Sequence, residues 1–482
     1  MLARLMGFRS APERPPAVAA EAMVATSQPL ATRAGLRALE RGGNAVDAAL
    51  AAAAMLCVAE PMSTGIGGDA FAIVWAGGEP HGLDAAGPAP TAAEPTEAVE
   101  ERGPRSVTVP GAVGGWAALA ERFGRLGLGD CLTDAINAAE RGVAASARVS
   151  EAWRTHGGPS ELGAAPGLGV RFTLPALATT LRRIASGGPD AFYRGYVASA
   201  IAQCSWLTEE DLAAYAPREV EPLEIDYRGT TVYELPPPTQ GVAALEGLGL
   251  LALGEPTLPA QVECVALALE DAFPRVRDGA DVTDLIEPGR LARRRGERPH
   301  GVHDPAAGTV YLCAVDGEGT AVSLIQSLYE SFGSHVVAPG TGIVLQNRGA
   351  CFAVGGRVEP GRRPYHTIVP ALLARGGDVL GPFGVMGGFL QAQAHVQLVS
   401  ALVDVGHDPQ AALDRPRFRV EGDTVRLEEG LWSREAELAS TGLRPVRSSD
   451  RGEFGGGQAI LRSGDAWLGG SDARKDGYAA GF

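Results

Sequence analysis

Hydrophobic residues fall in short segments separated by Gly, Pro and polar residues, and these segments predict both helices and strands. Residues 31–54 are rich in Ala and Leu and predict two helices that are separated at 42–44, where Gly-Gly-Asn interrupts the pattern. The second helix, from about Ala45 to Val58, is apolar on nearly every side, so we expect it to be deeply buried. A strand is predicted at 70–75, after a glycine-rich loop.

The pattern changes near residue 309. Residues 309–315 and 321–328 predict two strands, and the tight-turn signal at 316–319 joins them. Further helices are expected over 111–145, 175–203, 259–296, 391–405 and 409–413, and further strands over 227–235, 342–345 and 368–373. Helices and strands come in runs and do not alternate strictly, which predicts a layered α+β fold and argues against a Rossmann fold.

Composition narrows the class of protein. The 482 residues are 45% hydrophobic and 21% charged, which is the balance of a soluble globular chain. A net charge of −15 disfavours nucleic acid as a partner, because phosphates reward clustered Lys and Arg. Residues 1–9 lack the apolar run of a secretory signal, and no stretch approaches the ~20 apolar residues of a membrane span. We therefore expect a cytoplasmic protein without a membrane partner.

The cysteines and histidines do not suggest a metal or redox site. The six cysteines contain no Cys-x-x-Cys pair, and several lie in apolar segments, which is typical of small buried side chains in a reducing compartment. The eight histidines show no metal-ligand spacing. No metal and no organic cofactor are expected.

Single motifs have ordinary interpretations. The order around 65–68 (Gly-Ile-Gly-Gly) is helix, loop, strand, the reverse of a dinucleotide-binding loop, so a turn with close backbone packing is favoured. Thr309 by itself is the first residue of a strand after a polar loop. Gly387 and Gly388 form either a turn or a pair of backbone N–H groups that stabilise an oxyanion at a helix start. The chain contains no Gly-x-Ser-x-Gly elbow.

Taken together and in order, many segments resemble the gamma-glutamyltransferase family over nearly the whole chain. The segments are Met23–Thr32, Gly42–Ala49, Glu60–Gly68, Val109–Trp116, Gly187–Tyr193, Leu235–Pro238, Val315–Ser323, Ser331–Ser334, Pro339–Leu345, Met386–Gly388 and Asp476–Tyr478. The details around Tyr311–Cys313, Ile325–Ser327 and Arg363–His366 resemble the gamma-glutamyltransferase-like branch of that family.

The resemblance implies a four-layer αββα N-terminal-nucleophile hydrolase made as one precursor. The family's nucleophilic Thr aligns with Thr309, so cleavage is expected between Gly308 and Thr309. The products would be a large segment, 1–308, and a small segment, 309–482, intertwined in one domain. The resemblance also implies that the freed Thr309 amine is the base, that Ser327 assists self-cleavage, and that Gly387 and Gly388 stabilise the oxyanion.

The chain departs from the family at the positions that bind the glutamyl group. Ala86 stands where the family has an Arg for the α-carboxylate, and Cys351 stands where it has an Asp for the α-amine. His366 and Thr367 replace a pair of serines. Losing both charged anchors, each contributing roughly 1.5–3 kcal/mol, predicts that glutathione is a poor substrate. The candidate substrate-binding residues are Tyr329, Arg348, Cys351, His366, Thr367 and the Ala86 position, and we hypothesise that Arg348 and His366 bind an acid in another orientation.

Several functions stay open at this point. The leading hypothesis is a hydrolase, with transfer to an amine as a side activity, that acts on a gamma-glutamyl or related small-molecule amide. The alternatives are a glutathione hydrolase or gamma-glutamyltransferase with a rebuilt site, a glutaryl or cephalosporin acylase-like enzyme, and an unprocessed binding protein. The sequence leaves open whether the chain forms a homo-oligomer.

Overall fold

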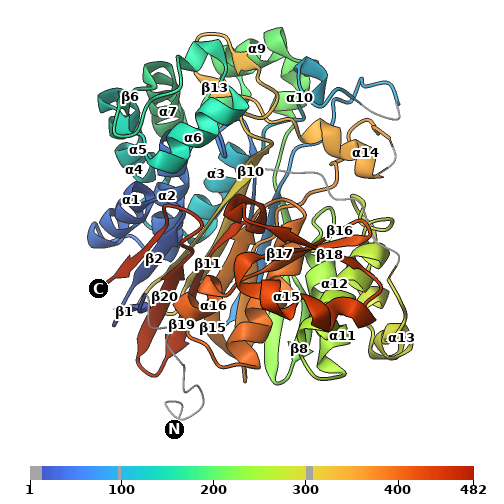
Figure 1. Cartoon of the computed structure of the whole chain (residues 1–482). Helices are drawn as coiled ribbons and strands as arrows, with labels where there is room; N and C mark the ends of the chain where they lie inside the picture. The colour runs from blue at the N-terminus through green and yellow to red at the C-terminus, as the bar shows by residue number, and fades with distance from the viewer. Residues whose placement is uncertain (1–13, 96–98, 300–307, 356) are drawn as a thin grey trace.

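Two stacked β-sheets form the centre of the molecule (Figure 1). The computed structural model describes residues 14–95, 99–299, 308–355 and 357–482. The expectations made above for residues 1–9 and for the polar stretch before Gly308 fall outside these described residues.

The first sheet has seven strands, and every neighbouring pair in it is antiparallel. In spatial order the strands are β1 (Ala17–Ala19), β20 (Ala466–Ser471), β19 (Gly456–Ser463), β15 (Asp378–Met386), β14 (Ala371–Arg375), β9 (Thr230–Glu234) and β8 (Leu223–Tyr227).

The second sheet also has seven antiparallel strands. In spatial order they are β21 (Tyr478–Gly481), β2 (Met23–Thr26), β10 (Gly308–Val315), β11 (Ala321–Tyr329), β3 (Asp69–Ala76), β4 (Glu79–Ala85) and β7 (Arg218–Val220). Both sheets mix strands from before and after Gly308, so the two parts of the chain are interleaved.

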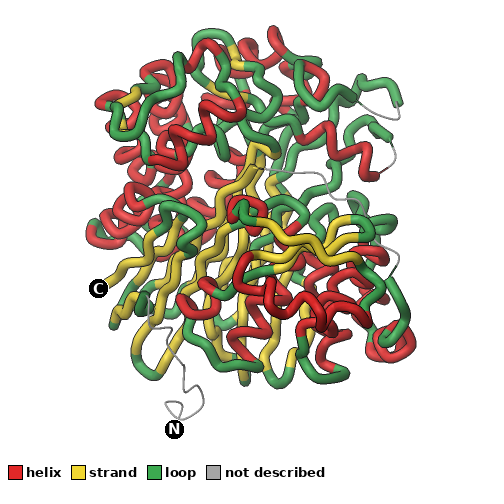
Figure 2. Tube along the Cα trace, in the orientation of Figure 1, coloured by secondary structure: helices red, strands yellow, loops and turns green. Residues whose placement is uncertain are grey.

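Helices cover the outer face of each sheet, which gives the four layers αββα (Figure 2). The helices on the first sheet are α11 (Gly241–Ala252), α12 (Leu258–Ala272), α13 (Pro288–Arg294), α15 (Leu390–Val403) and α16 (Pro409–Asp414). Those against the second sheet are α1 (Pro29–Glu40), α2 (Ala45–Ala59) and α3 (Ala112–Phe123). The predicted sandwich is therefore confirmed.

Smaller elements complete the chain. The remaining helices are α4 (Leu128–Cys131), α5 (Thr133–Arg141), α6 (Ala147–His156), α7 (Pro175–Gly187), α8 (Asp190–Tyr193), α9 (Gly195–Cys204), α10 (Glu209–Ala213) and α14 (Phe352–Gly355). The short strands are β5 (Val143–Ala144), β6 (Arg171–Phe172), β12 (Val337–Ala338), β13 (Ile343–Val344), β16 (Phe418–Glu421), β17 (Thr424–Glu428) and β18 (Arg444–Ser448), and a long 3-10 helix, η6, spans Glu429–Ser440.

Helix α2 is buried along its whole length, as its uniform apolar composition predicts. Asn44 caps its first turn by accepting from the backbone of Val46 and Asp47, and Asp47 accepts from Asn44 N in return. The β10–β11 turn fixes the same helix end, because Asp316 Oδ2 accepts from Ala45 N at 2.9 Å. The β10–β11 hairpin, which carries Thr309, is thus anchored to the buried helix.

Two predicted elements differ from the structure. The strand predicted over 227–235 contains β9, but its first residue, Tyr227, ends β8, and the turn between the two strands places Arg228 at φ 55° and Gly229 at φ 80°. That pair of positive φ angles matches the twist of a tight antiparallel hairpin. The long helical region predicted over 259–296 is divided into α12, a 3-10 turn and α13.

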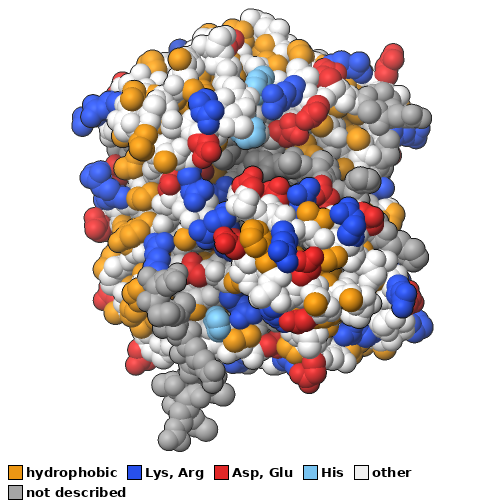
Figure 3. Space-filling view, in the orientation of Figure 1, with side chains coloured by type: hydrophobic (Ala, Val, Ile, Leu, Met, Phe, Trp, Pro, Cys, Tyr) orange, Lys and Arg blue, Asp and Glu red, His pale blue; other side chains and the backbone are white. Residues whose placement is uncertain are grey.

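The cysteines, the surface and the helices bear on the class of protein. All six cysteines are free, five are buried and Cys204 is half-buried, and burial raises the pKa of Cys57 to about 12, so its thiol is inert. On the face in Figure 3, acidic and basic side chains are interspersed and do not segregate by sign. Within the described residues, no helix has the length and apolar character that a membrane span requires.

Candidate active site

Thr309 lies in a bulge at the start of β10. Gly308 pairs with Tyr329 and Val310 with Gln326, so the register shifts between them and Thr309 occupies the irregularity. Its side chain is buried, and its Oγ1 donates to Ser327 Oγ at 3.3 Å. Ser327 Oγ also accepts from Tyr329 N at 2.8 Å, which fixes this hydroxyl on β11. The structure therefore brings the two predicted hydroxyl residues together.

Both hydroxyls face the space between the two sheets. Tyr311 on β10 and Ile325 on β11 belong to the core between the sheets, and strand alternation places Thr309 and Ser327 on the same face. Asp69 on β3 is the register partner of Ser327. The candidate site thus crosses three neighbouring strands at one end of the interior.

Thr309, Ser327 and Asp69 form a row across the three strands. The glycine-rich loop before β3 packs closely against this row. Gly67 forms an isolated bridge with Leu345. A Cβ placed on Gly68 would lie 2.3 Å from the carbonyl oxygen of Ser327, a distance that a side chain does not tolerate. The interpretation of this loop as a closely packed turn is confirmed, and the contact it permits is with the strand that carries Ser327.

Gly387 and Gly388 connect the end of β15 to the start of α15. Their φ angles of 136° and 61° lie where L-residues are strained, so the turn requires glycine. Two residues before the strand ends, Gly384 packs directly on the ring of Tyr311, since an added Cβ would lie 2.4 Å from that ring. β15 therefore crosses β10 at Tyr311, two residues after Thr309, before it reaches the glycine pair.

Arg348 is fully buried beside this row of residues. Its guanidinium carbon lies 4.5 Å from the centroid of the Tyr329 ring, and Nη1 donates to Thr367 Oγ1 at 3.2 Å and to Cys351 Sγ at 3.7 Å. Nε and Nη2 are buried and have no hydrogen-bond acceptor among the described residues. An unpaired buried charge is costly, so these N–H groups are candidates for binding an anionic ligand.

Equally buried arginines elsewhere are compensated. Arg363 pairs with Asp84 at 2.5 Å, Arg417 pairs with Asp472 at 2.6 Å, and Arg474 pairs with carboxylates as well. No carboxylate among the described residues lies within ion-pair distance of Arg348. The difference marks Arg348 as the cation that lacks its own counter-charge.

The two positions that depart from the family carry no charge. Ala86 is buried in the core between the sheets, and its backbone N–H donates to Asp84 Oδ1 at 2.9 Å. Cys351 is buried, and burial raises the pKa of its thiol, which therefore stays protonated near neutral pH. Neither position offers an ion to a zwitterionic amino acid.

His366 is held by the protein on both ring nitrogens. Nδ1 lies 2.8 Å from Pro364 O, and Nε2 lies 3.2 Å from Asp69 Oδ2. Because a carbonyl can only accept, Nδ1 carries a proton. Burial lowers the pKa of His366. Its interactions orient the segment that carries Thr367, and they leave Arg348 as the better candidate for binding an acid.

Gln240, which the sequence did not single out, ties the two halves of the site together. Its Nε2 donates to Thr367 O at 2.8 Å and to Gly388 O at 3.2 Å, and its Oε1 accepts from Tyr365 at 3.0 Å. Asp69 was missed as well. Its Oδ2 lies 3.2 Å from His366 Nε2, and its Oδ1 accepts from the backbone N–H groups of Gly87 and Gly111 at 3.2 Å each. Neither residue has a local signal, although both follow recognisable motifs.

The site offers hydroxyls, backbone N–H groups and one uncompensated cation. Among the described residues, no group of three or more His, Cys, Asp or Glu side chains is arranged to hold a metal ion. The arrangement suits nucleophilic attack by a hydroxyl on a carbonyl carbon, with charge stabilisation from backbone groups and an anion bound beside it.

Comparisons with known proteins identify the family of the chain. The family model described as gamma-glutamyltranspeptidase matches residues 31–482. The oxamate amidohydrolase proenzyme of Klebsiella pneumoniae is 36% identical, covering 96% of this chain and 99% of that protein. The glutathione hydrolase-like YwrD proenzyme of Bacillus subtilis is 33% identical, covering 95% and 98%.

The solved structures include a similar fold. The crystal structure of cephalosporin acylase from Bacillus halodurans superposes with a TM-score of 0.90 at 38% identity, over 99% of this chain and 98% of that one. The chain therefore belongs to the gamma-glutamyltranspeptidase family of self-processing N-terminal-nucleophile hydrolases.

Proposed function

We propose that this protein cleaves its own chain between Gly308 and Thr309 and then uses Thr309 to hydrolyse small-molecule amides whose acyl part carries a carboxylate. The observation that carries the proposal is the buried contact of 3.3 Å between the Thr309 and Ser327 hydroxyls, in the bulge where β10 begins.

The position of Thr309 supports self-cleavage. Its Oγ1 attacks the carbonyl carbon of Gly308, the peptide C–N bond breaks, and the nitrogen leaves as the α-amine of Thr309. Water then hydrolyses the resulting ester and releases the carboxylate of Gly308. Ser327 assists by its hydrogen bond to the attacking oxygen. Segments 1–308 and 309–482 stay together because both sheets interleave their strands.

Turnover uses the amine that cleavage releases. An α-amine has a pKa of about 7.7–8.0, so it accepts the Thr309 hydroxyl proton near neutral pH. Oγ1 attacks the substrate carbonyl, and the backbone N–H groups at Gly387 and Gly388 stabilise the oxyanion. The protonated amine then gives its proton to the leaving nitrogen. Water, or an acceptor amine in a transfer reaction, releases the acyl group from Thr309.

Arg348 sets the substrate class. The two unpaired N–H groups of its guanidinium match the two oxygens of a carboxylate, which is the geometry of a bidentate ion pair. The residues at 86 and 351 supply no anion for an ammonium group. The site therefore favours half-amides of dicarboxylic acids over gamma-glutamyl compounds, which also carry an ammonium group.

The relatives support this class without naming this chain's substrate. One is named an oxamate amidohydrolase, and oxamate is itself an amide joined to a carboxylate. A similar structure is named a cephalosporin acylase. Hydrolysis of glutathione is the second candidate, which the glutathione hydrolase-like relative favours and the uncharged positions 86 and 351 disfavour.

The decisive experiment combines mass and activity. Protein purified without exposure to proteases is expected to give two masses, which meet at Gly308 and Thr309. Thr309→Ala should give one full-length mass and no hydrolysis. The processed enzyme should hydrolyse oxamate or glutaryl anilide faster than gamma-glutamyl anilide. Full-length Thr309→Ala protein that still hydrolyses these amides would refute the assigned nucleophile.

A further inference from the structure

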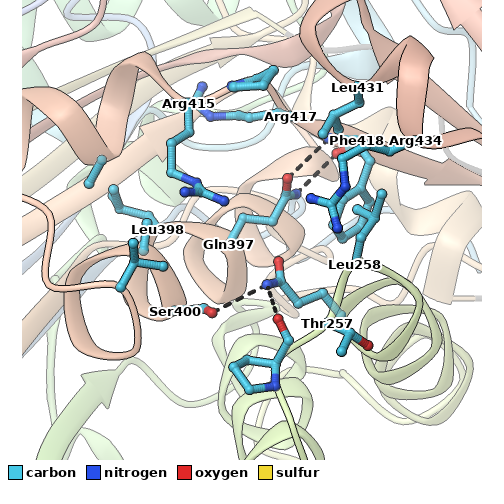
Figure 4. Close-up of a pocket in the computed structure, with 16 residues that line it drawn as sticks. Thr257, Leu258, Gln397, Leu398, Ser400, Arg415, Arg417, Phe418, Leu431 and Arg434 are labelled. Carbon is cyan, nitrogen blue, oxygen red and sulfur yellow. Dashed lines mark hydrogen bonds between the residues drawn. The ribbon is translucent and has the colours of Figure 1, made fainter. Parts of the chain in front are cut away.

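A pocket lies among the helices that cover the first sheet, away from Thr309. It has a volume of about 100 Å³ and is formed by the start of α12, the second half of α15, the segment between α16 and β16, and η6 (Figure 4). Ser400 lies ten residues along α15 from Leu390, where the helix begins. At about 1.5 Å per residue this is about 15 Å from the Gly387–Gly388 turn, so the pocket is separate from the candidate active site.

Three arginines line the pocket, and two of them have counter-ions. Arg417 pairs with Asp472 at 2.6 Å, and Arg434 forms two contacts with Glu437 at 2.7 and 2.8 Å. The side chain of Arg415 makes no hydrogen bond or ion pair with any other residue of the described chain. Figure 4 shows Arg415 and Arg434 reaching into the pocket from different sides, with Gln397 between them.

Arg415 is held in this unpaired state at a cost. It is half-buried, and burial together with the charge of Arg434 lowers its pKa. A side chain this long is free to turn toward water unless the local packing directs it inward. Its placement beside another cation, with no acidic side chain to compensate it, is the arrangement expected of a group that binds an anion.

The remaining wall limits the size and chemistry of the occupant. Leu258, Leu398 and Leu431 contribute apolar surface. Gln397 is fixed because its amide accepts from Phe418 N and donates to Phe418 O, both at 3.0 Å. Pockets for drug-sized ligands measure about 300–1,000 Å³, so this one suits only a compact molecule with an anionic end and a short hydrocarbon part.

We propose that this pocket is a binding site for a small organic carboxylate, whose oxygens are held by Arg415. Arg434, which is paired with Glu437, lies on the other side, and the leucines contact the hydrocarbon part. The site is independent of the proposed amide hydrolysis, because none of its residues belongs to the row around Thr309.

Malonate is the probe that tests the proposal. The melting temperature of the purified wild-type protein is followed while malonate replaces NaCl at constant ionic strength. A ligand that binds only the folded state raises the melting temperature in a saturable way. The same titration is made on Arg415→Gln, on Arg348→Gln to remove the candidate active-site anchor, and on Arg447→Gln as an exposed arginine that is paired with Glu435.

The proposal expects saturable stabilisation in the wild type, Arg348→Gln and Arg447→Gln. Because malonate can also bind at Arg348, Arg415→Gln is combined with Arg348→Gln, and this double variant should need at least a tenfold higher malonate concentration for half of the full shift than Arg348→Gln alone. Without malonate, Arg415→Gln should melt at the same temperature as the wild type or higher, since it loses an unpaired charge. Arg415→Lys keeps the positive charge but lacks the paired N–H groups of a guanidinium, so it should bind malonate with intermediate strength. It serves as the test if the Gln variant folds poorly.

Three outcomes would overturn the proposal. In the first, the double variant of Arg415→Gln and Arg348→Gln responds to malonate as Arg348→Gln alone does. In the second, the wild-type response rises linearly without saturation, as a general salt effect does. In the third, inorganic phosphate stabilises the protein and malonate does not, which would identify an inorganic anion site.

Discussion

The guanidinium of Arg348 lies over the ring of Tyr329, with its carbon 4.5 Å from the ring centroid, and Tyr329 is the register partner of Gly308. A buried cation is therefore separated from the proposed cleavage point by a single side chain. Tyr329 itself has φ 77°, an unusual conformation for an aromatic residue, at the end of the strand that carries Ser327. The strained position and the unpaired charge meet at the same place, as expected for a site built to bind a ligand.

Replacing Arg348 by Met should weaken the reaction with carboxylate-bearing amides without destabilising the folded protein. We expect kcat/KM for carboxylate-bearing amides to fall about 10-fold to about 150-fold, which corresponds to losing roughly 1.5–3 kcal/mol of charge-assisted hydrogen bonding. Hydrolysis of an uncharged acyl anilide should change little, and the folded state should become more stable because an uncompensated charge is removed. Steady-state kinetics on the paired substrates and urea unfolding measure these effects.

Arg363→Met is the matched control for this prediction. Arg363 is also buried, but it is paired with Asp84 at 2.5 Å, so its loss leaves an unpaired carboxylate. We expect about 3–5 kcal/mol of destabilisation for Arg363→Met, opposite in sign to Arg348→Met. Equal losses of kcat/KM on charged and neutral amides in Arg348→Met would show that Arg348 does not read the carboxylate.

Gly68→Ala should impair self-cleavage by displacing Ser327. The added methyl group would lie 2.3 Å from the Ser327 carbonyl oxygen, so β11 or the glycine loop must move. Overpacking of this kind costs about 1–3 kcal/mol. In Gly65→Ala the new methyl group would approach only the Leu328 side chain at 3.6 Å, an ordinary contact, so this variant should process normally. The two masses in a time course after synthesis report the difference, and equal processing rates would contradict the prediction.

The fold was more accessible from the sequence than the site. Helix α2 was predictable because all of its residues are buried, so its apolar composition is uniform. β10 and β11 were predictable because a turn signal separates two compact hydrophobic segments. The turn between β8 and β9 was not predicted, because Arg228 gives no local signal for the positive φ that the turn requires.

Site residues depend on contacts that local patterns do not encode. Thr309 and the Gly387–Gly388 pair came from the family resemblance, since composition alone favours structural roles for them. Gln240 contacts residues 127 and 148 positions away, and Asp69 contacts His366 across 297 positions. The unpaired state of Arg348 could not be predicted either, because it depends on the absence of an acid from an environment that only the folded chain defines.

Gly387→Ala should lower kcat without preventing folding. At φ 136° an alanine is strained, and its Cβ would lie 3.1 Å from Gly455 Cα, so the turn must rotate its N–H groups away from the oxyanion position. Loss of one oxyanion donor typically costs about 10²-fold to 10³-fold in kcat.

Gly376→Ala is the control for the conformational cost alone. Gly376 has φ 62° in the β14–β15 turn and has open space where a Cβ would be, so its substitution adds strain of about 1–2 kcal/mol far from Thr309. We expect an unchanged kcat in Gly376→Ala. Equal kcat values in the two variants would remove Gly387 from the oxyanion role.

Glu246→Gln should change how stability depends on pH. Glu246 is buried on α11, 3.9 Å from Arg290, and burial together with the neighbouring Asp271 raises its pKa to about 10 from the ordinary 4.5. Below the unfolded pKa both states hold the proton, and between the two pKa values only the folded state does. The stability that this proton supplies is therefore lost as pH rises through that window, by at most about 1.4 kcal/mol per pH unit.

Glutamine keeps the shape and removes the titration, so Glu246→Gln should gain stability over the wild type steadily from pH 5 to pH 9. Urea unfolding at pH 5, 7 and 9 tests this expectation, with the exposed Glu79→Gln as the control that keeps the wild-type profile. Parallel profiles for the wild type and Glu246→Gln would mean that Glu246 is ionised in the folded protein.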